Sequence, residues 1–375
     1  MGYKKLLIVV FLVFVFTHRW AFAENTNGFL SVTGACNLEF PRDHAAHPGY
    51  RTEWWYYTGN LQSAPGNRYG FQFTFFRRSI ISEGAKKKWP QPASAWRTAQ
   101  IYLAHAAITD LDGKQHLQAQ RMGRGVPGIA GESRNTDIVH IFLKKWSTRM
   151  GPQFHQLKVI SGEFSFDLNL TPVKPPVFHG QEGYSRKGST PERASCYYSF
   201  TRLETKGQLT VSGKTLAVHG LSWMDHEFST APLEPGLVGW DWFSLQLSDK
   251  TELMIYLLRK NDGSLGSATS GTHIRSNGKT RHLLRNDFQV TVTGTWKSPN
   301  PKAVYPARWR LQVPQLAMDL IIIPNLENQE MKTVESTGVT YWEGSVSVRG
   351  SKKGSPITGH GYVELTGYAK AFDAL

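Results

Sequence analysis

The sequence predicts an all-β protein. Apolar and polar residues alternate through many short segments, for example 71–75, 164–170 and 243–247. A period of two is typical of strands that bury one face. Turn-forming stretches such as DLDGKQ and RKNDGS separate these segments, and no long amphipathic helix is evident. Many short strands of this kind favour β-barrels or β-sandwiches.

An internal repeat predicts two domains. Two pairs of motifs recur in the same order in each half, EWWYYTGNL with GWDWFSLQL and then GQLTVSG with GSVSVRG. Each half ends on an aromatic residue two positions before an acid, Trp223 with Asp225 and Tyr362 with Glu364. The matched order favours a duplication over chance similarity between strands. We therefore predict domains at 24–235 and 236–375, divided near the stretch APLEPGLVG.

Residues 1–23 have the pattern of a secretory signal peptide. Lys4 and Lys5 precede an apolar run. Ala21-Phe22-Ala23 then has the A-x-A pattern that precedes a signal-peptide cleavage site. An uncleaved membrane anchor is the alternative. We expect a secreted or periplasmic protein after cleavage. The net charge of +14 fits association with an anionic membrane surface, and no nucleic-acid motif accompanies it.

The chain contains two cysteines, Cys36 and Cys196. An oxidising compartment allows them to form a disulfide. Two unpaired buried thiols are the alternative, and the sequence leaves both open. Neither cysteine has the context of a nucleophile or a zinc ligand.

Three clusters place carboxylates beside aromatic rings. They are Glu53 with Trp54, Trp55 and Tyr57; Asp225, His226 and Glu227 with Trp223; and Asp241 between Trp240 and Trp242. Neighbouring side chains of a strand point to opposite faces, so Asp241 faces away from its two tryptophans. Trp223 shares a face with Asp225, and Glu53 shares one with Trp55. We expect these two pairs to line a barrel interior together.

A structural role is the alternative for each of these acids, because a carboxylate beside tryptophan can simply accept an indole N–H or cap a turn. His105, within the apolar stretch YLAHAAITD, is more typical of a hydrogen-bonded core histidine than of a catalyst. The sequence has no G-x-S-x-G elbow, no H-E-x-x-H helix and no phosphate-binding glycine loop. We therefore predict no metal and no cofactor.

Four motifs indicate a resemblance to a known family, namely EWWYYTGNL, LAHAAITD, WMDHEFS and GWDWFSLQL. Together they resemble the exported lipocalin-like proteins related to carotenoid 1,2-hydratase and kievitone hydratase, which include secreted hydrolases. The resemblance covers nearly the whole chain after residue 49. It implies two tandem lipocalin-like antiparallel β-barrel domains. It also implies that Asp225, in the aromatic-x-Asp-His motif, donates a proton to an isolated double bond.

The residues themselves fit that chemistry. An aspartic acid in an apolar pocket stays protonated near neutral pH, and indole rings stabilise a passing carbocation. We predict Asp225 as the acid, with His226 or Glu53 as the base. Residues expected to bind the substrate are Trp54, Trp55, Tyr57, His105, Trp223, Glu227, Trp240, Asp241 and Trp242.

Three functions are compatible with this pattern. The first is an enzyme that hydrates or hydrolyses a hydrophobic, isoprenoid- or lipid-like substrate. The second is a non-catalytic carrier of such a ligand. The third is an envelope accessory protein that works beside an ABC-type transporter permease. A titratable acid that faces a closed cavity favours the enzyme, whereas a cavity lined only by apolar groups favours the carrier.

Overall fold

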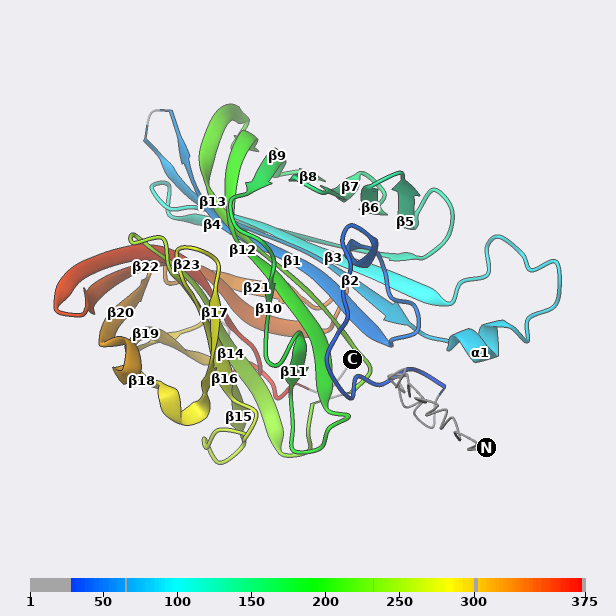
Figure 1. Cartoon of the computed structure of the whole chain (residues 1–375). Helices are drawn as coiled ribbons and strands as arrows, with labels where there is room; N and C mark the ends of the chain where they lie inside the picture. Colours follow the sequence, from blue (N-terminus) through cyan, green and yellow to red (C-terminus); the bar gives the residue numbers. More distant parts are fainter. Residues whose placement is uncertain (1–27, 65, 232, 300–302, 373–375) are drawn as a thin grey trace, which may run out of the picture.

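The chain folds into two antiparallel β-sheets. A computed structural model describes residues 28–64, 66–231, 233–299 and 303–372, and the predicted signal peptide lies outside them. Strands make up 61% of the structure and helix 4%. The all-β prediction is therefore confirmed, with one near-closed barrel and one half-barrel. Figure 1 shows the first sheet, in blue to green, above the second, in yellow to red.

The first sheet follows the strand order β4-β3-β2-β1-β13-β12-β9-β8-β7-β6-β5, with β10 and β11 paired to β12. Its core is made by the inward-facing residues of these strands, such as Phe71, Phe73 and Phe75, which are fully buried as the alternation predicts. The strands are β1 Thr52–Ser63, β2 Arg68–Ser79, β3 Gln100–Asp110, β4 Gln115–Arg124, β5 Ala130–Asn135, β6 Ile138–Leu143, β7 Trp146–Gly151, β8 Phe154–Ile160, β9 Phe164–Pro172, β10 Val177–Phe178, β11 Tyr184–Arg186, β12 Ala194–Val211 and β13 Lys214–Ser229.

The second sheet follows the order β17-β16-β15-β14-β23-β22-β20-β19-β18, with β21 paired to β22. It has its own core, built around Phe243, Trp309 and Trp342. The strands are β14 Leu237–Leu247, β15 Glu252–Lys260, β16 Ser270–Ile274, β17 Thr280–Leu284, β18 Gln289–Lys297, β19 Val304–Val313, β20 Met318–Pro324, β21 Glu330–Thr333, β22 Val339–Lys352 and β23 Ser355–Leu365.

The repeated motifs occupy equivalent places in the two sheets. In the first sheet, opening strand β1 pairs with closing strand β13, and Tyr56 lies opposite Asp225. In the second, β14 pairs with β23, and Trp242 lies opposite Glu364. β1 and β2 then pack against β23 and β22. As a result β1 is buried on both faces, one against its own barrel and one against the second domain.

Short helical turns and one disulfide complete the fold. The turns are η1 Arg42–His44, α1 Glu83–Lys86, η2 Arg285–Asp287 and η3 Pro314–Leu316. Cys36 and Cys196 form a disulfide, so the segment before β1 is tied to β12. Within the described ranges, no helix combines the length and apolar character needed to cross a bilayer.

Candidate active site

A cavity of about 260 Å³ lies between the two domains. Its first wall is the outer face of β1, β2 and β13, and its second wall comes from β14, β22 and β23. Aromatic rings dominate both walls, among them Trp54, Tyr56, Trp240, Trp242 and Tyr341. A space of this kind suits a hydrophobic ligand, and its ring faces can stabilise positive charge.

Asp225 is the acid of the first wall, and its side chain is almost fully buried. Its Oδ1 accepts hydrogen bonds from the Trp223 indole (2.6 Å) and the Ser199 hydroxyl, and its Oδ2 accepts one from Tyr197 (2.8 Å). Burial raises the pKa of Asp225 to about 7, although these three donors favour the ionised form. Trp242 of the second domain donates to the Tyr197 hydroxyl (3.1 Å), which joins this cluster to the opposite wall.

Two more acids, Glu343 and Glu364, stand on the second wall. They lie opposite each other on β22 and β23. Tyr56 donates to Glu343 Oε1 from the first domain (2.5 Å). Burial and the charge of Glu364 raise the pKa of Glu343 well above its ordinary value. Burial also raises the pKa of Glu364 to about 7, against hydrogen bonds from Thr366 and Trp240.

Glu227 differs from these three acids because it has a cation beside it. Lys187 Nζ lies 2.8 Å from its carboxylate and 4.4 Å from the centre of the Tyr256 ring. The Ser195 hydroxyl also donates to Glu227. This pair is therefore a fixed ionic element of the cavity, whereas Asp225, Glu343 and Glu364 form no ion pair in the described part of the chain.

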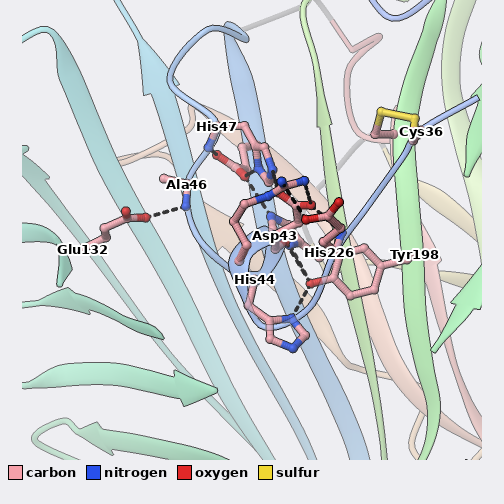
Figure 2. Close-up of polar contacts among 12 residues, drawn as sticks. Cys36, Asp43, His44, Ala46, His47, Glu132, Tyr198 and His226 are labelled. Carbon is pink, nitrogen blue, oxygen red and sulfur yellow. Dashed lines mark hydrogen bonds and ion pairs between the residues drawn. A yellow bond between two sulfur atoms is a disulfide. The ribbon is translucent and has the colours of Figure 1, made fainter. Parts of the chain in front are cut away.

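Glu53, on the neighbouring strand β1, points to the other face of the sheet, inside the first domain. Its carboxylate contacts Arg77 Nε (2.6 Å), His47 Nδ1 (2.7 Å) and His226 Nε2 (2.8 Å). Burial opposes its ionisation, but the charges of Arg77 and His47 outweigh burial and hold the pKa of Glu53 well below its usual range. Figure 2 labels the two histidines of this cluster, His47 and His226, together with Asp43.

The expectation that Glu53 and Trp55 line one space with Trp223 and Asp225 is wrong. Residues opposite each other in an antiparallel pair share a face, and the register places Trp55 opposite His226. That register sends Glu53, Trp55 and His226 into the first barrel. Neither Glu53 nor His226 therefore reaches the cavity as the base that we expected beside Asp225.

His47, Glu53 and His226 could in principle hold a metal ion, because their ligand atoms lie within 4.8 Å of one another. Arg77 sits on the same carboxylate, however, and its charge opposes a cation there. The second nitrogen of each histidine is also engaged, His47 Nε2 by Asp43 and His226 Nδ1 by the Tyr198 hydroxyl. The arrangement is that of an ionic network within the core.

The other predicted site residues divide between cavity and core. Trp54, His105, Glu227, Trp240 and Trp242 line the cavity. His105 is held there by Tyr341 and Ser336, and burial lowers its pKa to about 3. The remaining four lie elsewhere: Trp223 is buried beside Asp225, Trp55 donates to His44, Tyr57 contacts His155, and Asp241 pairs with Arg259 (2.7 Å).

Sequence reasoning missed Tyr56, Tyr197, Glu343 and Glu364 as site residues. Glu364 carries a signal in the sequence, because the repeat matches it to Asp225. Glu343 directly precedes the repeated motif GSVSVRG but lies outside it. Glu343 lines the cavity only because its face of β22 packs against the first domain, and the sequence around Glu343 does not predict which face of the strand does so.

The fold and site define a class: two-domain lipocalin-like proteins that enclose an aromatic, acid-bearing cavity at the domain junction. The chain belongs to the AttH-like family, whose model matches residues 31–368. A candidate AttH from Nitrosomonas europaea is similar over 90% of this chain and 99% of its own, with 31% identity and a TM-score of 0.78.

Two further solved structures share the fold. Kievitone hydratase from Nectria haematococca is 16% identical, with a TM-score of 0.68, over 91% of this chain and 95% of its own. CghA in complex with Sch210972 is 11% identical, with a TM-score of 0.50, over 86% and 90%. No curated protein matches this chain.

Proposed function

We propose that this protein is an enzyme that hydrates, or by the same acid chemistry hydrolyses, a hydrophobic isoprenoid- or lipid-like substrate in the cavity between its domains. Asp225 is the proton donor. The observation that carries the proposal is a buried carboxyl with a pKa of about 7 on an aromatic wall. A general acid works best when its pKa lies near the working pH.

The surroundings of Asp225 fit proton transfer to carbon. Oδ1 accepts two hydrogen bonds and Oδ2 accepts one, so Oδ2 keeps a site for the transferable proton. The indoles of Trp54 and Trp242 offer ring faces to the carbocation that forms. The mostly apolar walls limit the water that could trap this cation at the wrong carbon.

Among acid-catalysed reactions, hydration is the first choice. The name of one similar structure, kievitone hydratase, states that reaction for its own substrate. The likeness at 16% identity concerns the fold, so the proposal for this chain depends on Asp225 and its cavity.

The test starts from the substrate. Mass spectrometry of lipids extracted with the purified protein gives the candidate molecule, and turnover is then measured in water labelled with ¹⁸O. We expect Asp225→Asn to lower kcat by about 10²–10⁴-fold, because the amide keeps the shape but supplies no acidic proton. Binding of the extracted molecule should persist.

Asp241→Asn is the matched control, since Asp241 is also buried but pairs with Arg259 away from the cavity. Normal turnover by Asp225→Asn contradicts the assignment of the acid. Tight binding of a defined lipid with no turnover by the wild type favours the carrier function instead.

We further propose that the protein acts after export. The disulfide between Cys36 and Cys196 suits an oxidising compartment. The excess of basic residues suits an anionic membrane surface, close to a hydrophobic substrate or a transporter permease. N-terminal sequencing of protein from the native envelope should begin at Glu24, and an intact Met1 in the cytoplasm contradicts export.

A further inference from the structure

We propose that Glu364, supported by Glu343, is the base of the reaction: from the second domain it accepts the proton that the attacking water loses, across the cavity from Asp225. This inference rests on the proposed function. It replaces the bases expected from the sequence, because Glu53 and His226 lie on the far side of β1 and β13.

The two walls are related by the repeat. Glu364 takes the place in β23 that Asp225 takes in β13, and each lies opposite an aromatic residue of its opening strand, Trp242 and Tyr56. Because the two domains pack with these faces toward each other, the equivalent acids belong to opposite walls of one cavity. A substrate between them meets a carboxyl on each side.

Glu343 gives the second wall an open polar atom. Its side chain is 1% exposed, and Oε1 is occupied by the Tyr56 hydroxyl. Oε2 is buried and has no hydrogen-bond partner among the described residues. A buried carboxyl oxygen without a partner is costly unless a ligand or water satisfies it. Since Glu343 lines the cavity, the missing partner belongs there.

The groups around Glu364 determine how many of the two acids on the second wall, Glu343 and Glu364, are ionised. The charged and titratable groups that line the cavity with it include Arg51, His105, Lys187, Asp225, Glu227 and Glu343. Lys187 pairs with Glu227, and burial keeps the pKa of His105 at about 3, so that ring is neutral. Burial and the charge of Glu364 raise the pKa of Glu343 well above its ordinary value and so favour its protonated form, whereas the pKa of Glu364 is about 7. Glu364 is therefore the member of the pair that can accept a proton.

The reaction balances with water as its co-reactant. Protonated Asp225 gives its proton to one alkene carbon, and the π electrons form the new C–H bond, which leaves a cation on the neighbouring carbon. A water oxygen forms the C–O bond, and its surplus proton passes to the Glu364 carboxylate. The product is an alcohol. A proton then returns through water from Glu364 to Asp225, so the enzyme is restored without an oxidant or a reductant.

Two measurements on the full-length protein test Glu364 without the substrate. The first is an infrared titration of protonated carboxyl groups between pH 5 and 9. We expect two carboxyl signals that titrate near pH 7, one lost in Glu364→Gln and the other in Asp225→Asn. If only Asp225→Asn removes a titrating signal, Asp225 stands as the acid and Glu364 is not the base. If only Glu364→Gln removes one, the assignment of Asp225 as the acid is contradicted.

The second measurement uses hexyltrimethylammonium, a stable mimic of a tertiary carbocation on an alkyl chain. Calorimetry should show binding that strengthens from pH 5 to pH 8 as the wall ionises. Glu364→Gln should weaken binding at pH 8 by about 10-fold and flatten its pH dependence. Glu335→Gln is the control, because Glu335 is exposed in the same turn that supplies Thr337 to the cavity.

Glu343→Gln provides a second variant in case Glu364→Gln fails to fold, which circular dichroism and thermal unfolding reveal. It replaces a protonated, neutral carboxyl with a neutral amide and leaves Glu364 in place, so the second infrared signal should still titrate near pH 7. Loss of that signal in Glu343→Gln would assign it to Glu343 and overturn Glu364 as the base. If Glu364→Gln folds and leaves both the titration and the binding of the cation unchanged, the assignment of Glu364 is wrong.

Discussion

The two faces of β1 and β13 bury carboxylates with opposite properties. On the inner face, Glu53 contacts Arg77 and two histidines, and its pKa is held well below the usual range. On the outer face, Asp225 contacts only neutral donors, and its pKa rises to about 7. Both side chains are buried to a similar degree. Between these two acids, the neighbouring cations rather than the degree of burial set the direction of the pKa shift.

Breaking the inner cluster should have the largest effect. Arg77 and Glu53 are both fully buried, so Arg77→Met leaves the buried Glu53 carboxylate with His47 as its remaining cationic partner. We expect the free energy of unfolding to fall by about 3–5 kcal/mol, measured by urea denaturation at pH 7. Asp319→Asn, which breaks the exposed pair with Arg310, should cost at most about 1 kcal/mol. Similar losses in the two variants contradict the contrast between buried and exposed pairs.

The pH dependence of stability should differ in sign between the two acids. The pKa of Asp225 is raised in the folded state from 3.8 to about 7, so its ionisation destabilises the fold as pH rises from about 4 to 7. Glu53 has a lowered pKa, so its contribution is present at neutral pH and is lost as pH falls. From pH 5 to pH 8, the free energy of unfolding should therefore fall by about 2–3 kcal/mol less in Asp225→Asn than in the wild type.

Urea denaturation at several pH values measures this difference. Glu53→Gln is the comparison variant, because it should be less stable than the wild type at pH 8 and approach it in acid. An unchanged slope between pH 5 and 8 for Asp225→Asn would mean that Asp225 ionises normally in the folded protein.

Asp241 is an intermediate case, because it is a buried acid with a cation beside it and burial still raises its pKa in spite of Arg259. It accepts hydrogen bonds from Arg259 (2.7 Å) and Tyr368. We expect Asp241→Asn to lower the free energy of unfolding by about 1.5–3 kcal/mol, as for lost hydrogen bonds to charged groups, and to leave turnover within a factor of about two. A large loss of turnover with normal stability would place Asp241 in the chemistry.

The smallest effect compares two neighbouring tyrosines on opposite faces. Tyr56 donates to Glu343 across the domains, and Tyr57 contacts His155 inside the first barrel. Each phenylalanine variant should lose about 0.5–1.5 kcal/mol of stability. Only Tyr56→Phe should also change the pH dependence of hexyltrimethylammonium binding. An equal change in Tyr57→Phe means that the two faces are not independent.

Much of the fold was predictable because its signals are local. Alternation marks strands, and the repeat marks the two halves, wherever the strands finally pack. Asp225 was found because its motif is short and carries a titratable group among rings. The partners of that acid were not predictable from the same signals. A shift of one residue between β1 and β13 reverses which acids face the cavity, and the sequence does not state the register.

The second wall was hidden for a further reason. Glu343 and Glu364 reach Asp225 only because one sheet lies on the other, and long-range packing of two domains leaves no periodic trace in either segment. Tyr56 shows the same limit, because its hydroxyl finds a partner 287 positions away.

The packing of the two repeated sheets on each other, β1 on β23 and β2 on β22, bears on the ancestry of the chain. A surface that packs on a copy of itself is the arrangement of an isologous dimer, in which both copies must carry the same side chains. Fusion of the two copies removes that restriction, since each half can then mutate alone. One half here carries an aspartate and the other a glutamate at the equivalent position, a division that no symmetric pair of identical subunits can encode.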